Sequence, residues 1–269
     1  MKFENTRAYN FEGALKGMRN PMNSWDKSDS FYGIVDLYDG NDLNDMTEKW
    51  GDESRYVWLQ RNGVLRASDA YDGLFDVAFI GPNDMKLAQQ LILAGSEHAK
   101  FTRQIFVSVD ITAPLLWWKE FDTYKIGTVA NSTSTMHKLS SAPITKEMFA
   151  FDDNADDLVV SQGKSICGEW EYVFSDYIDD IIHICEELRL KFIETGDKSY
   201  WRALIQILPS AYLQTRTVTM SYANLRNIYF QRQHHKLNEW HEFCEWINTL
   251  PYSKDLITLE ANNETDRAD

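Results

Sequence analysis

The residues best suited to ligand chemistry lie in a segment without acid. No Asp or Glu occurs between Lys198 and Asn238, although 41 of the 269 residues are acidic and the formal net charge is −14. This segment contains Lys198, Arg202, Arg216, Arg226, Arg232, His234, His235 and Lys236. Such a segment can hold a small anion that the rest of the surface repels, and phosphate suits the two-pronged donor of arginine. The alternative is that these cations pair with carboxylates elsewhere in the fold.

A second segment, from Trp118 to His137, is rich in hydroxyl and amide side chains. These are Thr123, Thr128, Asn131, Ser132, Thr133, Ser134 and Thr135. A turn of this composition offers hydroxyls and backbone N–H groups to a phosphate or to the edge of a pyrimidine. A plain polar loop would have the same composition.

Arg232 lies where one predicted helix breaks and the next begins. A guanidinium at that position can point into a cleft at the helix termini. The alternative is an ion pair with Glu239 or Glu242.

Common catalytic and cofactor motifs are missing from the sequence. His241 and Glu242 begin like the zinc-protease helix, but Glu245 stands where that motif needs its second histidine. There is no Cys/His quartet, and we expect no metal. The chain also lacks a Walker motif, a GxGxxG loop and a GxSxG nucleophile.

Composition bounds the class of protein. Hydrophobic residues make up 43% of the chain and include nine Trp, which is enough for a core. No apolar run is long enough to span a membrane, and the first residues lack an apolar signal core, so we expect a cytoplasmic protein. The pI near 4.9 argues against binding a nucleic acid polymer. The three Cys are expected to be reduced and mostly buried.

Periodicity predicts an α+β chain with strands in the first half and helices in the second. Residues 105–111 alternate as a strand, and residues 31–38, 55–60 and 75–80 are short β-rich runs. Helices are predicted at 83–94, 113–123, 172–195, 197–208, 222–231 and 237–247. Asn83, Asp197 or Ser199, and Ser221 are the expected N-caps, and Gly196 is expected to end the helix at 172–195. Trp117 and Trp118 are expected in the core or at a subunit interface.

The ends of the chain carry weaker patterns. We expect residues 1–259 to form a single α+β domain, in which residues 1–30 are an arm that is irregular or a short helix. Residues 154–164 are expected to form an acidic loop, and 260–269 a frayed, disordered tail.

Two segments taken in order resemble the flavin-dependent thymidylate synthases, the ThyX family. That family has a helix closed by Leu-Pro, a Thr/Arg-rich stretch, an Asn-x-x-x-Leu helix leading to Leu-Arg, and an Ala-Gln-Trp-Glu helix. The corresponding residues here are Ile207-Leu208-Pro209, Gln214-Thr215-Arg216-Thr217-Val218-Thr219, Asn224-Leu225, Gln231-Arg232 and Asn238-Glu239-Trp240. The resemblance spans roughly residues 83–248.

The departures from the family pattern concern charge. The signature Arg-His-Arg-x-x-Ser is matched here by Thr123-Tyr124-Lys125 and then Thr128, and the later Ser-x-Arg-Tyr falls near Thr133–Met136. By resemblance this segment holds the flavin and the nucleotide phosphate. Two arginines and a histidine are therefore replaced, and each charge-assisted bond that is lost is worth roughly 1.5–3 kcal/mol.

The resemblance implies a ThyX-like fold, with a mixed or antiparallel sheet and several long helices. It implies reductive C5 methylation of dUMP or a related pyrimidine nucleotide, with FAD, NADPH and methylene-tetrahydrofolate, in a homotetramer. Arg232 would activate the pyrimidine. Nucleotide or phosphate binding is assigned to Thr128, Asn131, Ser132, Ser134, Arg202 and Arg216, and cofactor binding to Lys125, His137 and His235.

Two other functions fit the same residues. The first is a nucleotide-binding sensor or sponge that keeps the fold without the chemistry, which the replaced Arg-His-Arg favours. The second is an interaction or structural protein whose Trp-rich surfaces make subunit contacts.

Overall fold

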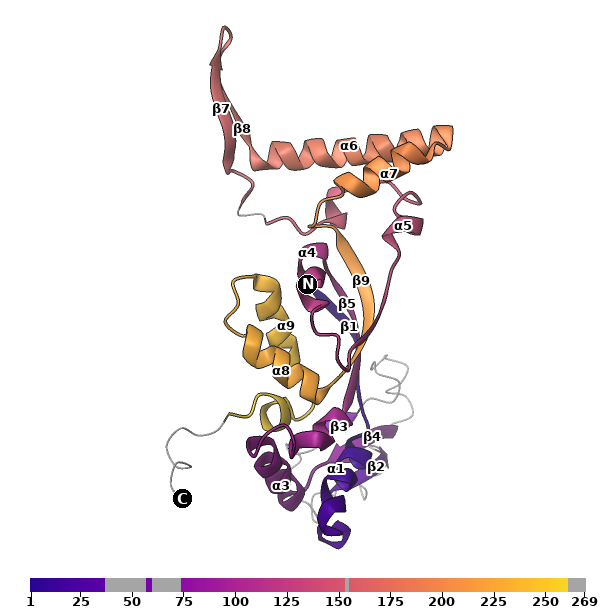
Figure 1. The fold of residues 1–269 in the computed structure, drawn as a ribbon, viewed down its shortest axis with the longest axis vertical. Helices are drawn as coiled ribbons and strands as arrows, with labels where there is room; N and C mark the ends of the chain where they lie inside the picture. The colour runs from indigo at the N-terminus through magenta and orange to yellow at the C-terminus, as the bar shows by residue number, and fades with distance from the viewer. Residues whose placement is uncertain (37–56, 60–73, 153–154, 261–269) are drawn as a thin grey trace. The chain divides into compact units, whose positions relative to one another are not determined.

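The computed structural model describes residues 1–36, 57–59, 74–152 and 155–260 (Figure 1). Its strands are β1 (Lys2–Tyr9), β2 (Phe31–Asp36), β3 (Val57–Leu59), β4 (Leu74–Phe79), β5 (Phe106–Pro114), β6 (Val129–Ser132), β7 (Val159–Ser165), β8 (Gly168–Val173) and β9 (Leu213–Ser221). Its α-helices are α1 (Phe11–Arg19), α3 (Pro82–Leu93), α4 (Leu115–Phe121), α5 (Thr135–Lys138), α6 (Phe174–Thr195), α7 (Lys198–Ile207), α8 (Tyr222–Arg232) and α9 (Asn238–Asn248). This is the predicted α+β class, with the long helices in the second half.

The strands form three sheets. One has four strands in the order β1-β5-β9-β6, one has the order β2-β4-β3, and β7 pairs with β8. β4 is antiparallel to both neighbours, with Phe31 opposite Phe79 and Val57 opposite Ala78. Within the described ranges, no helix is both long and apolar enough to cross a membrane.

Contacts divide the chain into two compact units, which are described separately. The first contains residues 1–111, 124–130 and 217–269, and the second contains residues 112–123 and 131–216. The residues beyond 260, which include the predicted frayed tail, lie outside the described part of the chain.

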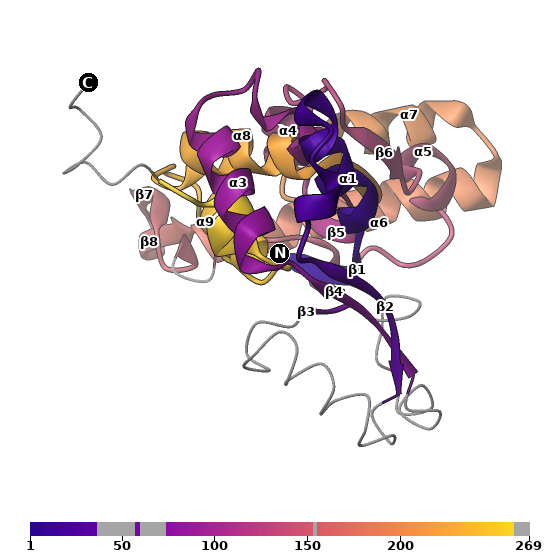
Figure 2. The ribbon, with the colours of Figure 1, turned by 90° about the horizontal axis from the view of Figure 1, so that it is seen from below.

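The core of the first unit contains the strand predicted from period-two alternation. Val107, Val109 and Ile111 on β5 are buried, as expected for one face of a sheet. The helices α1 and α3 lie side by side (Figure 2). They are joined by Arg19, whose Nε donates to the fully buried Asp84 at 2.5 Å.

The first 30 residues, expected to be an irregular arm or a short helix, contain a short helix and also a strand that was not predicted. They contain β1 as well as α1, and Asn5 Nδ2 donates to Asp110 Oδ2 at 2.7 Å. Trp246 Nε1 donates to Thr6 Oγ1 at 3.1 Å. The strand was missed because its sequence, KFENTRAY, is mostly polar and lacks the alternation of a half-buried strand.

In the second unit, α6 and α7 pack side by side (Figure 1). Cys185 of α6 and Leu204 of α7 form a core cluster with Leu139, Ile144 and Phe149. Trp117 and Trp118 on α4 are completely buried, with ring centroids 4.9 Å apart, so this pair belongs to the core.

A strand of the second unit, β7, occupies the second half of the expected loop at 154–164, and it pairs with β8. β7 and β8 form an antiparallel ribbon in which Ser165 pairs with Gly168 (Figure 1). Gly168 has φ +125°, which favours glycine, and allows the chain to reverse tightly. The acidic residues before β7 and the glycine within it, Gly163, hid the short strand from the sequence pattern.

The predicted helix ends are largely confirmed. Asp197 caps α7 by accepting from Ser199 N at 2.8 Å, Ser221 caps α8, and Gly196 ends α6 with φ +68°. Asn83, however, is not the cap of α3. The carboxylate of Asp29 accepts from the backbone N–H of Asn83 at 2.8 Å, so the first turn is capped from outside the helix.

Candidate functional site

Arg232 is the last residue of α8, where the chain turns toward α9. The turn is closed by the backbone N–H of His235, which donates to the Arg232 carbonyl at 2.9 Å. A cation in the last turn of a helix is favoured by the partial negative charge at that end. The break predicted after this residue is therefore present, and the side chain is half-buried.

Two aromatic residues hold the Arg232 side chain. Its Nε donates to the Tyr124 hydroxyl at 2.7 Å. The guanidinium carbon lies 4.6 Å from the centroid of the Trp240 ring and 5.5 Å from that of Tyr124. A guanidinium over a tryptophan face gains cation–π attraction, and one bond at Nε orients its plane. Tyr124 and Trp240 thus orient the guanidinium, and Glu242, one of its expected partners, pairs with the amino group of Met1.

The loop that carries Tyr124 is attached along α8. The Tyr124 hydroxyl donates to Gln231 Oε1 at 3.0 Å, and Asn224 Nδ2 donates to the Ile126 carbonyl at 2.5 Å. Gly127 has φ +73°, and a Cβ there would lie 3.0 Å from Asn224 Oδ1. The loop therefore needs glycine at this position, both for its backbone conformation and for its close approach to α8.

Thr128, on the same loop, has a buried hydroxyl that lacks a partner. Its Oγ1 makes no hydrogen bond to any residue in the described part of the chain. Buried polar atoms are normally paired, and leaving one unpaired costs about 1–3 kcal/mol. The Thr128 hydroxyl is thus a buried hydrogen-bonding group without a partner among the described residues.

The first unit brings together four of the predicted site residues around Tyr124 and Trp240. Lys125 is exposed on the loop, Thr128 follows it, and Arg232 is clamped beside them. The His235 ring centroid lies 6.1 Å from that of Trp240, and its Nδ1 accepts from the backbone N–H of Leu237 at 3.2 Å. An accepting Nδ1 leaves Nε2 as the donor of the neutral ring.

The other predicted site residues belong to the second unit. Asn131 and Ser132 are exposed on β6, Ser134 is half-buried before α5, and Arg202 is exposed on α7. His137 lies in α5, and its side chain is outside what the structure describes.

Arg216 pairs with a carboxylate of the protein, which was the alternative explanation for the cations of the acid-free segment. Its guanidinium donates to Asp122 Oδ1 at 2.6 Å and to Gln214 Oε1 at 3.0 Å, and it lies 4.2 Å from the Trp118 ring centroid. Arg226, in the first unit, is also used by the protein itself, because it donates to two backbone carbonyls near the C-terminus at 2.7 Å each.

Tyr124 was not among the predicted site residues. By resemblance its position only marked the loss of the signature histidine, whereas in the structure the phenol holds the predicted arginine. The available signal for Tyr124 was a tyrosine at the position of the signature histidine, beside the polar loop that follows it. The arginine it contacts is 108 residues away, and no local pattern reports such a contact.

The buried cysteines have raised pKa values. Burial raises the pKa of the Cys244 thiol to about 11 and also raises that of Cys185, so both stay protonated. Within the described residues, no group of three His, Cys, Asp or Glu side chains is placed to hold a metal ion.

Comparison with known proteins finds likeness in structure but not in sequence. No protein-family model matches the chain, and no curated protein matches it. Two structures of the flavin-dependent thymidylate synthase ThyX from Helicobacter pylori with FAD and dUMP align at 13% identity, with TM-scores of 0.56 and 0.58. The alignments cover 96% of this chain and 98% and 97% of those chains. The chain therefore has a fold like that of the flavin-dependent thymidylate synthases.

Proposed function

We propose that this chain binds a pyrimidine mononucleotide of the dUMP type through Arg232. The observation that carries the proposal is the clamped guanidinium of Arg232, held by Tyr124 and Trp240. The unpaired hydroxyl of Thr128 on the same loop supports it. Both features occur on a fold whose solved relatives are described with dUMP.

The chemistry of the two groups suits this ligand. Arginine carries five N–H donors and no acceptor, and the bond to Tyr124 uses Nε. The carbonyl oxygens of uracil and the phosphate oxygens are both acceptors for such donors. By the family resemblance, Arg232 contacts the pyrimidine. The Thr128 hydroxyl would then serve a carbonyl or phosphate oxygen as a neutral donor.

The described residues do not fit a flavin dinucleotide in the manner of the family. The hydroxyl of Thr123 donates to the Glu120 carbonyl at 2.7 Å, and the hydroxyl of Tyr124 is used by Gln231 and Arg232. Two of the three positions that match the signature are thus occupied with contacts inside the protein. Lys125 offers one positive charge without bidentate geometry. We therefore derive no step through FAD, and binding without flavin chemistry is the function that we favour.

Titration calorimetry tests the proposal with matched arginine variants. We expect wild-type protein to bind dUMP or UMP, and Arg232→Met to lose roughly 10- to 100-fold in affinity, as for one charge-assisted bond. Arg103→Met, at an exposed arginine of the same unit, should bind as wild type. If no pyrimidine nucleotide binds, or if both variants bind equally well, the assignment of Arg232 is wrong.

Reductive methylation of the nucleotide is the second candidate, favoured by the fold alignment over 96% of the chain. It would need FAD, NADPH and methylene-tetrahydrofolate, with Asn131, Ser132, Ser134, Arg202, Arg216, Lys125, His137 and His235 contributing to ligand or cofactor binding. A homotetramer is expected on this proposal, and sedimentation would measure it. A yellow protein that releases tritium from C5-labelled dUMP would establish the enzyme. A colourless protein that binds dUMP but cannot be reconstituted with FAD would leave only binding.

A further inference from the structure

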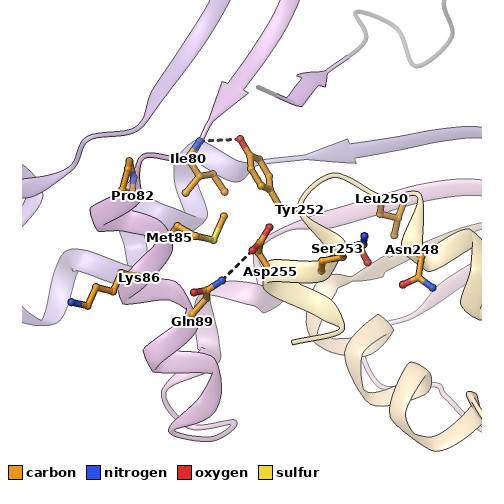
Figure 3. Close-up of a pocket in the computed structure, with 11 residues that line it drawn as sticks. Ile80, Pro82, Met85, Lys86, Gln89, Asn248, Leu250, Tyr252, Ser253 and Asp255 are labelled. Carbon is orange, nitrogen blue, oxygen red and sulfur yellow. Dashed lines mark hydrogen bonds between the residues drawn. The ribbon is translucent and has the colours of Figure 1, made fainter. Parts of the chain in front are cut away.

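A cavity of about 600 Å³ in the first unit has no part in the proposed nucleotide site. It lies between α3 and the segment that follows α9, which includes the short π-helix η9 (Ser253–Ile257) (Figure 3). Ile80, Met85 and Leu250 supply apolar walls, and Gln89, Ser253 and Asp255 supply polar groups. This volume is in the range of small-molecule sites, which combine apolar walls with a few polar groups.

The first sign of a missing ligand is Ser253. The residue is only 3% exposed, and its Oγ makes no hydrogen bond to any described residue. Its backbone is satisfied, since the N–H donates to Leu250 at 3.1 Å and the carbonyl accepts from Thr258 N at 2.8 Å. The hydroxyl is therefore the unpaired group of Ser253, and Ser253 is one of the residues that line the cavity.

The second sign is the carboxylate of Asp255. Its Oδ1 accepts from Gln89 Nε2 at 3.1 Å across the cavity (Figure 3). No described lysine, arginine or histidine lies within ion-pair distance of it, and the Lys86 side chain points away from it in Figure 3. Burial raises the pKa of the Asp255 carboxyl above its usual value, and the charge of Lys254, which also lines the cavity, opposes that rise. A half-buried carboxylate with one neutral donor favours a ligand that brings further N–H groups.

The cavity is formed before any ligand arrives. Tyr252, which has φ +51°, donates its hydroxyl to the Ala78 carbonyl at 2.8 Å and accepts from Ile80 N at 3.0 Å. These two bonds fasten the C-terminal segment to the end of β4. Ser253 is the next residue after Tyr252, and Asp255 follows two residues later, so this attachment fixes their positions relative to α3.

We propose that this cavity binds a flat heterocycle through adjacent N–H donors directed at Asp255, with the ring against the walls of Ile80, Met85 and Leu250. A carboxylate accepts two parallel N–H bonds from the ring N–H and amino group of a 2-amino-4-oxo edge. That edge occurs in guanine and in pterins. Adenine and thymine lack it, because neither presents an amino group beside a ring N–H.

Calorimetry with guanosine and with pterin, using full-length wild-type protein, tests the proposal and separates the two sources. We expect one of them to bind at least about tenfold more tightly than adenosine or thymidine. Asp255→Asn should weaken that binding roughly 10- to 100-fold, as expected for a charge-assisted pair of bonds. Asp179→Asn, at an exposed carboxylate of α6, is the matched control and should leave the affinity unchanged.

Ser253→Ala separates ligand binding from folding. The free variant should melt at the wild-type temperature or slightly above it, because the hydroxyl is unpaired without ligand, yet it should bind the heterocycle more weakly. If Asp255→Asn fails to fold, Met85→Trp, which fills the cavity, replaces it and should abolish binding. Absence of guanosine and pterin binding to wild-type protein, or equal affinity in every variant, overturns the proposal. Arg232→Met should not affect binding of the heterocycle. Failure of this proposal can therefore be distinguished from failure of the proposed nucleotide site.

Discussion

Removing the hydroxyl of Tyr124 should loosen Arg232 while keeping the ring beside it. Tyr124→Phe preserves the aromatic face that lies 5.5 Å from the guanidinium carbon. It removes the oxygen that accepts from Arg232 Nε at 2.7 Å and donates to Gln231 Oε1 at 3.0 Å. The variant thus tests the hydrogen bonds separately from the stacking.

The magnitude follows from these two bonds. A hydrogen bond to a charged group contributes about 1.5–3 kcal/mol and a neutral one about 0.5–1.5 kcal/mol. Gln231 is exposed and Arg232 is half-exposed, so water replaces part of what is lost, and the lower ends apply. We expect the free energy of unfolding to fall by about 1.5–2 kcal/mol.

Urea unfolding of Tyr124→Phe, Arg232→Met and the double variant measures the coupling directly. The coupling should be about 1 kcal/mol, and the Kd for dUMP in Tyr124→Phe should rise roughly 3- to 10-fold because Arg232 is less well oriented. Tyr9→Phe, at an exposed tyrosine, is the control. Additive effects of the two substitutions, with an unchanged Kd, would refute the claim that Tyr124 positions Arg232.

Three further predictions concern stability. Asp84→Ala leaves the buried Arg19 cation without its partner and should lower the free energy of unfolding by about 3–5 kcal/mol in urea, whereas a loss below about 1 kcal/mol would contradict a buried pair. The Thr217 hydroxyl holds the pKa of the Asp110 carboxyl below its usual 3.8. The ionised carboxylate of Asp110 therefore stabilises the fold fully above the unfolded-state pKa, and this contribution is lost as pH falls through the folded-state pKa. The stability difference between wild type and Asp110→Asn should therefore shrink between pH 7 and pH 3, and a constant difference would count against it. Gly127→Ala, at φ +73°, should cost about 1–2 kcal/mol in thermal unfolding, and an unchanged midpoint would show that the loop relaxes.

The helices could be predicted because their signals are local. A cap such as Asp197 or Ser221 and a stop such as Gly196 act within a few residues, and the structure has all three. The strands depended on more distant partners. β9 buries Val218 and Met220 at period two, but Gln214 and Arg216 interrupt the pattern, and the sequence analysis did not predict this strand.

The candidate site could be predicted only in part for the same reason. The position of Arg232 at a helix break follows from the polar residues around Gln233, which are visible in the sequence. Its partner Tyr124 lies on a loop that reaches α8 through Asn224, and this contact depends on the whole fold. The arginine could therefore be predicted from local residues, whereas the group that orients it is brought to it only by the tertiary fold.

The acid-free segment can now be divided by what each arginine does. Arg216 pairs with a carboxylate and Arg226 with backbone carbonyls, so their charge is used in holding the chain together. Arg232 is contacted by the phenol of Tyr124 and the indole of Trp240. A basic side chain oriented in this way can attract an anion that the rest of a protein of net charge −14 repels. The orientation of Arg232 by these two rings, more than the number of basic residues, is the reason for assigning the anionic ligand to it.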